Sequence, residues 1–530
     1  MTITHLEPTP MQSSQSPPRI DVTDAESQSR NPIASHFRLI IDQSGVCQSV
    51  ISQEYSGAGT PDDPFVVDFL EHDARNPRTF SQTRKWTITL LQAMSAFTVA
   101  FVSTAYSGGI ADIRETFGVS SEVGLLGLSL FVLGFALGPL LWAPLSELFG
   151  RRYLFISTYA VLVALNAGTV FVQNIQSLIV LRFLAGTIGS SPLTNAGAVI
   201  SDMFTPAERG RATTLFAAAP FLGPSIGPIV SGFLGATAGW RWIEGLMAIM
   251  TGVLLIICCL SVPETYSPVL LRRRAEFLRK GTGKYYVSKF ERHKGQQTMK
   301  QRYKVALCRP WVLLFTEPIV LMSSTYVAIV YGTLYMLFAA YPIVYQKHRG
   351  WSPGEGGLAF LGVIAGMALA IIYTLFEHGR YTRILVSEGS ASPETRLPPS
   401  MIGAVLLPIG LFWFAWTNGP EIHWIVSITA SSFFAAGLVL VFLSLLNYLI
   451  DSYTIFAASA LAANSVLRSL LGAAFPLFST KMYDGLGIHW ASSVPGFLAL
   501  ACLPFPFVFY RYGARIRSKC AMSSEAQQYQ

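Results

Sequence analysis

Two arginines lie inside long apolar segments, where a charged side chain is costly. Arg182 is near the start of the segment 178–200, one turn before Gly186, and Arg468 lies within the segment 453–478. A charge in hydrocarbon costs at least ~2.5 kcal/mol on insertion scales, so such residues normally face a partner or a water-filled cavity. We interpret Arg182 as a proton-relay or gating charge that lines a cavity. The alternative is an arginine whose long side chain reaches the headgroups from a helix end. For Arg468 the two interpretations have about equal weight.

A short charged segment connects two further apolar segments, 123–141 and 153–172. It contains Glu147, Gly150, Arg151 and Arg152. Because both apolar segments are long enough to cross a bilayer, this connection returns the chain to the side that it left. Arginines are retained on the cytoplasmic side of membranes, so the connection is predicted to lie in the cytosol.

The other connections divide into a basic set and a set with few basic residues. The basic set includes Arg209, the dense segment between the sixth and seventh apolar segments, and the residues after the twelfth. Both termini and the central loop are therefore expected in the cytosol. Glu377 and Arg380, after the eighth apolar segment, repeat the acid, glycine and arginine of the first charged connection. This repeat predicts two related halves.

The composition sets the class of protein. Hydrophobic residues make up 51% of the 530 positions and charged residues 13%, whereas soluble domains carry about 25% charged residues. Mean hydropathy is +0.44. These values predict a polytopic membrane protein, and the net charge of +8 is explained by membrane orientation without a nucleic-acid partner.

Twelve apolar segments predict an all-α membrane protein with twelve transmembrane helices, in two six-helix halves around a central cavity. The segments are 86–106, 123–141, 153–172, 178–200, 212–234, 242–262, 319–344, 357–375, 399–416, 424–450, 453–478 and 491–510. The predicted parts are a disordered cytosolic tail (1–85), with a short ordered patch at 64–69, an N-terminal half (86–262), a basic central loop (263–309), a C-terminal half (310–512) and a cytosolic C-terminal tail (513–530).

The fifth segment contains two Gly-Pro pairs, Gly223-Pro224 and Gly227-Pro228. The glycines are four residues apart, which places them on one helix face and allows close approach of a neighbouring backbone. Each proline removes a backbone donor and bends the helix. We expect a kinked, tightly packed helix that seals one side of the cavity.

Together these motifs resemble the major facilitator superfamily and, within it, the twelve-span drug–proton antiporters of fungi. The segment 144–152 is similar to the signature between spans two and three, Arg182 with Gly186 to the span-four signature, and 223–232 to the span-five antiporter signature. The resemblance covers roughly residues 76–515. Ala143, Glu147 and Leu148 depart from the usual superfamily pattern but are common choices in the fungal subgroup.

The resemblance implies roles for these residues. Glu147, Arg151 and Arg152 would form a cytosolic charge network that breaks and re-forms as the halves rock, with Asp202 and Arg209 as its counterpart. Span one has no midplane carboxylate, so the proton-carrying group is not identified. Glu244 and Glu317 lie near span ends and are expected to be solvated at the interface. Polarity within the spans suggests the substrate-cavity residues Tyr106, Tyr331, Tyr335, Phe338, Asn447, Asn464 and Arg468.

Three functional classes were weighed. The first is a proton-coupled antiporter that exports a drug, a polyamine or a fungal secondary metabolite by alternating access. The second is a facilitator or importer of an organic acid or nutrient. The third, a membrane enzyme, is disfavoured because the sequence has no His cluster, nucleophile elbow or phosphate-binding loop. We predict the exporter, driven by the proton gradient without a cofactor, monomeric, and in the plasma membrane or, as the alternative, the vacuolar membrane.

Overall fold

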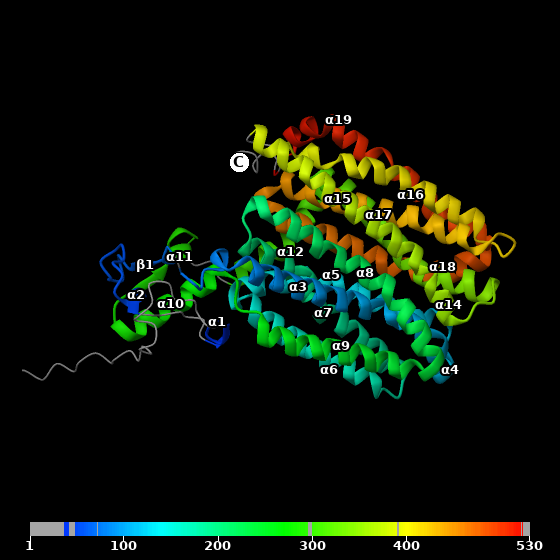
Figure 1. The fold of residues 1–530 in the computed structure, drawn as a ribbon, viewed down its shortest axis with the longest axis horizontal. Helices are drawn as coiled ribbons and strands as arrows, with labels where there is room; N and C mark the ends of the chain where they lie inside the picture. The colour runs from blue at the N-terminus through cyan, green and yellow to red at the C-terminus, as the bar shows by residue number, and fades with distance from the viewer. Residues whose placement is uncertain are drawn as a thin grey trace, which may run out of the picture. The chain divides into compact units, whose positions relative to one another are not determined.

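A computed structural model describes residues 36–41, 48–71, 73–294, 299–388, 392–520 and 522. The chain divides into two compact units (Figure 1). The smaller unit is Met1–Thr79 with Ser267–Gln296, and the larger is Phe80–Tyr266 with Gln297–Gln530. The larger unit is a helical bundle and holds every candidate site residue named above.

The first half of the bundle follows the predicted order of spans. Its helices are α3 (Gln82–Ala105), η3 (Tyr106–Gly109), α4 (Ile110–Phe117), α5 (Ser121–Phe149), α6 (Arg151–Val170), α7 (Ile175–Met203), α8 (Pro206–Ala238) and α9 (Trp240–Ser261). Polar residues mark several helix starts. For example, Asn174 accepts a hydrogen bond from the Ser177 N–H at the start of α7, as an N-cap residue does.

The second half begins with α12 (Met299–Thr316), which lies before the first span of this half. The elements that follow are α13 (Pro318–Tyr341), the π-helical η4 (Pro342–His348), α14 (Pro353–Leu358), α15 (Phe360–Glu388), η5 (Pro393–Arg396), α16 (Pro398–Thr417), α17 (Trp424–Ser452), η6 (Thr454–Phe456), α18 (Ala457–Cys502) and α19 (Pro504–Lys519).

By length and hydropathy, the described helices include 11 candidate membrane spans, and the last of them, Ala457–Lys519, has 63 residues. It is not one straight helix, because Gly487 has φ 74° and ψ 169°. Tyr483 and Ser492 would lie about 13 Å apart along a continuous helix, yet their hydroxyls are 2.8 Å apart. The chain therefore reverses at Gly487, and the twelve-span interpretation counts its two sides separately.

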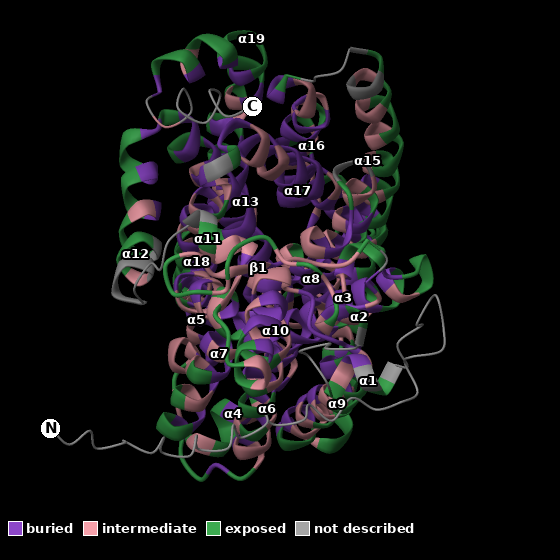
Figure 2. Ribbon diagram, turned by 90° about the vertical axis from the view of Figure 1, so that its left-hand side faces the viewer, coloured by how far each residue is buried: buried purple, intermediate pink, exposed green. Residues whose placement is uncertain are grey.

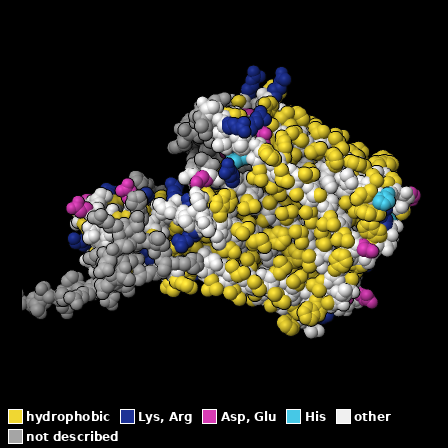
Figure 3. Space-filling model, viewed as in Figure 1, with side chains coloured by type: hydrophobic (Ala, Val, Ile, Leu, Met, Phe, Trp, Pro, Cys, Tyr) yellow, Lys and Arg dark blue, Asp and Glu magenta, His cyan; other side chains and the backbone are white. Residues whose placement is uncertain are grey.

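The burial pattern is that of a protein in a lipid solvent. The face of the bundle in Figure 3 is almost wholly hydrophobic, with charged side chains towards its two ends. In Figure 2 the helices α13 and α17 are largely buried. In the most apolar 18-residue segment of each of these spans, 78% and 72% of the residues are buried. Apolar side chains lie both on the surface and in the interior of the bundle. This distribution is typical of helices that pack together inside the hydrocarbon of a bilayer.

The smaller unit differs from the disordered tail that the sequence analysis expected for residues 1–85. Its elements are α1 (His36–Ile41), α2 (Gln48–Ile51), β1 (Phe65–Val67), η2 (Pro77–Thr79), α10 (Ser267–Thr282), β2 (Tyr286–Ser288) and α11 (Lys289–Lys294). Strand β1 pairs in parallel with β2 of the central loop. Val50 and Val67 share a core with Leu271, Ala275 and Leu278.

A buried ion pair supports this unit, because Arg274 Nη1 lies 2.6 Å from Asp73 Oδ2. The expected ordered patch at 64–69 contains β1, but the order extends well beyond it. The sequence analysis missed this fold because the tail's few apolar residues pack against Leu271, Ala275 and Leu278, about 200 residues further along the chain, where no local periodicity can reveal them. Residues 1–35 and 42–47 of the expected tail lie outside the described residues.

Candidate functional site

Arg182 on α7 is fully buried among α3, α5 and α9 of the first half. Its Nε donates to the Gly127 carbonyl at 3.2 Å, and its Nη2 donates to the carbonyls of Val102 at 3.0 Å and Ser103 at 3.2 Å. The guanidinium also lies over the rings of Tyr106 and Phe131, 4.7 and 4.6 Å from their centroids. These contacts satisfy a charge inside the bundle and do not fit an arginine that reaches the headgroups.

The Val102 and Ser103 carbonyls are available because α3 ends at this point. The Tyr106 N–H turns to the Thr104 carbonyl, so it does not continue the α-helical pattern to Val102. The last carbonyls of a helix lack intrahelical partners and carry partial negative charge. Arg182 on α7 therefore caps the carboxyl end of α3, and it also joins α3 to α5 through Gly127.

Glu244 lies in the same buried region, which corrects the expectation that interfacial water solvates it. Its side chain is buried, with the residue 1% exposed. Met247, one turn further along α9, contacts Arg182 Nη1 through its Sδ at 3.8 Å. Thr169 Oγ1 on α6 lies 2.7 Å from Glu244 Oε2 and 2.6 Å from the Asn166 carbonyl. The sequence analysis assigned Glu244 by its distance from the span end and could not see that α6 and η3 cover it.

A row of hydroxyl groups connects this site to the second half. The Ser103 hydroxyl on α3 lies 2.9 Å from the Tyr335 hydroxyl on α13, and Tyr331 donates to Tyr335 at 3.4 Å. Arg468 on α18 then lies over the Tyr331 ring, 4.7 Å from its centroid. The structure thus brings together four residues that the sequence analysis had selected separately, namely Arg182, Tyr331, Tyr335 and Arg468.

The remaining candidate cavity residues occupy several environments. Phe338 stacks on Phe360 with ring centroids 5.1 Å apart, and Asn464 donates to Ser324 at 3.4 Å. Tyr106 donates to the Gly124 carbonyl at 3.0 Å, so it belongs to the Arg182 cluster. Asn447 is half-buried on α17.

Small residues let the helices of the first half approach closely. A Cβ on Gly186 would meet the backbone of Phe131 on α5, and one on Gly223 or Gly227 would meet the backbone of α3. Pro228 has no N–H to donate to the Pro224 carbonyl, as a continuing helix would require. The Thr104 hydroxyl on α3 supplies this bond instead, at 3.0 Å. The Gly-Pro pairs therefore fasten α8 to α3.

At the predicted cytosolic end, the charged connection after α5 is organised by Glu264. This buried carboxylate accepts the N–H of Arg151 at 2.9 Å and of Arg152 at 3.2 Å, which are the first residues of α6. Gly150 before them has φ 96° and cannot carry a Cβ, because the Glu264 carboxylate occupies that space. Burial raises the pKa of the Glu264 carboxyl, while hydrogen bonds from backbone N–H groups act in the opposite direction.

Arg151 completes this cluster through its side chain. Its Nε lies 3.3 Å from Asp202 Oδ2 at the end of α7, and its Nη1 donates to Ser146. Glu147, which the resemblance gave as the acid of the network, is exposed, and the contacts come from Asp202 and Glu264 instead. The role of Glu147 stays a prediction. Arg209 lies half-buried in the first turn of α8.

The second half has its own ion pairs at the predicted cytosolic end, but the pair equivalent to Arg151–Asp202 is not at the expected repeat. Glu377 and Arg380 form a 3.1 Å pair within α15, because this helix continues to Glu388 where a loop was expected. The structural equivalent of Arg151–Asp202 is Arg396–Asp451, at 2.8 Å. It joins the start of the third span to the end of the fourth, as Arg151–Asp202 does in the first half.

A second buried pair in this half joins Arg517 to Glu394. Arg517 Nε and Nη2 lie 2.9 and 2.8 Å from the two carboxylate oxygens. Like Glu264 in the first half, this pair connects the region before the third span to the end of the sixth. Among the described ion pairs of the bundle, those at the predicted cytosolic end each join residues of the same half. They therefore make each half rigid.

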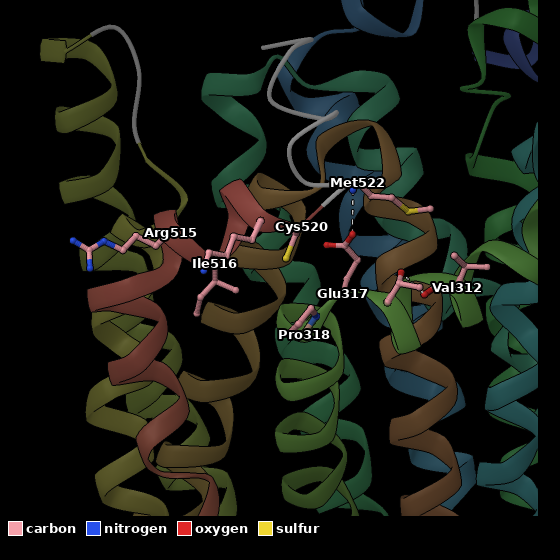
Figure 4. A pocket seen from close by; sticks show the side chains of 9 residues that line it. Val312, Glu317, Pro318, Arg515, Ile516, Cys520 and Met522 are labelled. Carbon is pink, nitrogen blue, oxygen red and sulfur yellow. Dashed lines mark hydrogen bonds between the residues drawn. The ribbon is translucent and has the colours of Figure 1, made fainter.

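Glu317 occupies the start of α13 and is also buried, contrary to the expected interfacial solvation. It accepts hydrogen bonds from the Tyr453 hydroxyl at 2.9 Å and from the Met522 N–H at 3.1 Å. A cavity of about 620 Å³ lies beside it, lined by the ends of α12 and α19 and by Cys520 (Figure 4). Glu317 thereby fastens the chain after α19 to the second half.

The comparisons with known proteins agree with this arrangement. A family model described as Major Facilitator Superfamily matches residues 92–476. The chain belongs to this superfamily. As a member, it is a multi-pass membrane transporter of a small molecule and not an enzyme.

Several curated fungal members of the superfamily are similar over most of their length. The major facilitator superfamily multidrug transporter mdrA of Aspergillus fumigatus is 58% identical over 93% of this chain and 82% of its own. The efflux pump FUB11 of Gibberella moniliformis is 56% identical over 91% and 81%. The transporter sorT of Penicillium rubens is 52% identical over 89% and 91%.

A solved major facilitator shares the fold. The structure of the proton:xylose symporter XylE bound to 6-bromo-6-deoxy-D-glucose gives a TM-score of 0.58 over 81% of this chain and 97% of that chain, at 15% identity. This likeness supports the major facilitator fold predicted from the sequence.

Proposed function

We propose that this major facilitator exports a small organic compound in exchange for protons, by alternating access of a central site to the two sides of the membrane. The main support is the buried Arg182 and its contacts with α3, α5 and α9. A second support is that similar relatives bear the names efflux pump and multidrug transporter. A charge held inside a membrane protein marks an ion or proton pathway. The proton gradient is the energy source in this proposal, and no cofactor is required.

The central residues indicate the kind of compound. Tyr331, Tyr335 and Phe338 form a buried aromatic cluster, with successive ring centroids 4.9 and 5.4 Å apart, and Ser103 adds a hydroxyl group. Sites of this type suit amphipathic organic compounds, which bury their apolar part and use a few polar groups for orientation. A drug, a polyamine or a fungal secondary metabolite fits the proposal, and the relatives' names favour drugs and metabolites.

The rigid halves support the proposed movement. Arg151–Asp202 and Arg396–Asp451 each fasten helices within one half, so that the halves can rock as bodies about the central site. The proposal places both termini in the cytosol, on the side of the basic connections. It also places the protein in the plasma membrane as a monomer.

Transport into proteoliposomes tests the proposal. The purified chain is reconstituted and a panel of fluorescent organic compounds, beginning with ethidium, is added outside vesicles with an acidic lumen. Antiport predicts that uptake exceeds that of vesicles without a gradient, and that a protonophore abolishes the excess. Uptake that ignores the gradient would refute antiport, and uptake driven by an acidic exterior would instead support a proton-linked importer.

A further inference from the structure

We propose that Glu244 is the group that carries the coupling proton, and that Arg182 transmits its protonation state to the contact between the two halves. This inference rests on the proposed proton coupling and identifies its residue.

Two short contacts of the Thr169 hydroxyl are best satisfied by a protonated Glu244. The Thr169 hydroxyl has one hydrogen and two short contacts, 2.6 Å to the Asn166 carbonyl and 2.7 Å to Glu244 Oε2. A carbonyl oxygen can only accept a hydrogen bond, and an ionised carboxylate can only accept. A single hydroxyl hydrogen makes only one full two-centre hydrogen bond. If Thr169 donates it to Asn166, which is the shorter contact, Glu244 is the donor in the contact with Thr169. The geometry therefore fits a neutral carboxylic acid.

Arg182 and Glu244 interact electrostatically, but among the described contacts no hydrogen bond or ion pair joins them. The Arg182 guanidinium donates to the carbonyls of Gly127, Val102 and Ser103 and to Met247 Sδ. Tyr106 on η3 is a further titratable group that interacts with Glu244. Arg241, one turn before Glu244 on α9, donates to the Val172 carbonyl, and α6 contributes the uncharged Asn166 and Thr169. A carboxylate among them would lack a bonded cation, which is costly away from water.

Loss of the proton changes the partner that Arg182 prefers. A carboxylate is a stronger acceptor for guanidinium than a backbone carbonyl is, and Glu244 lies one turn from Met247, which Arg182 already touches. Arg182 would then leave the end of α3, where it holds the Ser103 carbonyl. The Ser103 hydroxyl is bonded to Tyr335 across the interface. Deprotonation of Glu244 thus weakens a contact between the halves, and protonation restores it.

The position of Glu244 suits export. It lies in the first turns of α9, at the end of the bundle that the proposed orientation places outside, so an external proton has a short path to it. The proton that binds the Glu244 carboxylate from outside leaves the same oxygen when the site faces the cytosol. No other covalent bond is made or broken in the cycle.

Infrared difference spectroscopy through a pH titration tests the assignment without a substrate. A protonated carboxylic acid has a C=O stretching band that disappears on ionisation. We expect the wild-type protein to lose such a band as the pH rises, and Glu244→Gln to lack this component. Thr169→Val, which keeps the shape of the side chain, should shift the frequency of the band. Glu115→Gln, which removes an exposed carboxylate from α4, is the matched control and should leave the spectrum of the buried acid unchanged.

Transport then separates this inference from the proposed function. In Glu244→Gln, uptake of ethidium into acidic vesicles should fall to the level seen without a gradient, while binding of ethidium persists. If the wild-type protein follows the gradient and Glu244→Gln still does, or if its infrared spectrum matches the wild type, the assignment of Glu244 is overturned. If transport by the wild-type protein does not depend on the gradient but the Glu244 band titrates, proton antiport and the coupling role of Glu244 are both refuted. Only the protonation of Glu244 in the fold is then supported.

Discussion

The bond between Thr104 and Pro224 gives a sharp test of how α8 is fastened to α3. Pro228 cannot donate to the Pro224 carbonyl, and the Thr104 hydroxyl supplies the donor at 3.0 Å. Replacing Thr104 by Val keeps the shape of the side chain and leaves the carbonyl without this partner. The cost should appear as a lower midpoint of thermal unfolding in detergent, followed by intrinsic fluorescence.

The expected magnitude is modest. A buried carbonyl without a partner costs about 1–3 kcal/mol in soluble proteins, but side-chain hydrogen bonds between membrane helices average about 0.6 kcal/mol, with a maximum of about 1.7 kcal/mol. We therefore expect a destabilisation of about 1 kcal/mol. For a unit the size of one half, this lowers the midpoint by about 2–4 °C.

A double-mutant cycle isolates the cause. Pro228→Ala restores the N–H that reaches the Pro224 carbonyl along α8, so Thr104→Val should cost almost nothing in that background. Thr104→Ser keeps the hydroxyl and should resemble the wild type. Thr89, whose hydroxyl bonds only a carbonyl of its own helix at 2.9 Å, gives the matched control Thr89→Val. An equal cost of Thr104→Val with Pro228 and with Ala at that position would refute the reasoning.

Three further predictions follow from the same contacts. Gly186→Ala should lower the unfolding midpoint and reduce transport, because its methyl group meets the α5 backbone, whereas Gly197→Ala, with nothing within 4 Å, should behave as wild type in both assays. Tyr335→Phe removes the bond to Ser103 and should slow gradient-driven uptake several-fold with little change in stability; unchanged uptake would argue against the contact between the halves. Burial raises the pKa of the Glu264 carboxyl in the folded protein. Its contribution to stability is therefore complete at low pH and is lost as the pH rises through the pKa of the folded state. The midpoint of thermal unfolding should fall more steeply with increasing pH in the wild type than in Glu264→Gln.

Local sequence was sufficient for the spans and for Arg182. Apolar length predicted the bilayer crossings because each crossing is a property of one continuous segment. A charge within such a segment is visible without any knowledge of its neighbours. The Gly-Pro pairs of α8 likewise predicted close packing, although the partner helix, α3, was identified only in the structure.

The parts that sequence analysis missed depend on distant partners. Glu244 was placed at the interface because it lies near a span end, but residues of α6 cover it. The polar pair Asn166 and Thr169, one turn apart within an apolar segment, was the available signal. The expected repeat at Glu377 and Arg380 rested on a short local similarity of sequence. The pair that corresponds in structure to Arg151–Asp202 is Arg396–Asp451, and the spacing of these two residues in the sequence does not reveal that they are close.

The smaller unit has a consequence for how genes of this family can be recombined. Residues 48–79 contribute β1 and Val50, whereas Leu271 and Leu278 of the same core belong to the segment between the two halves. A chimaera that exchanges only the amino-terminal segment with a relative would combine two surfaces that were selected in different proteins. The two segments should therefore vary together among relatives, and a functional hybrid should be easier to obtain when both come from the same parent.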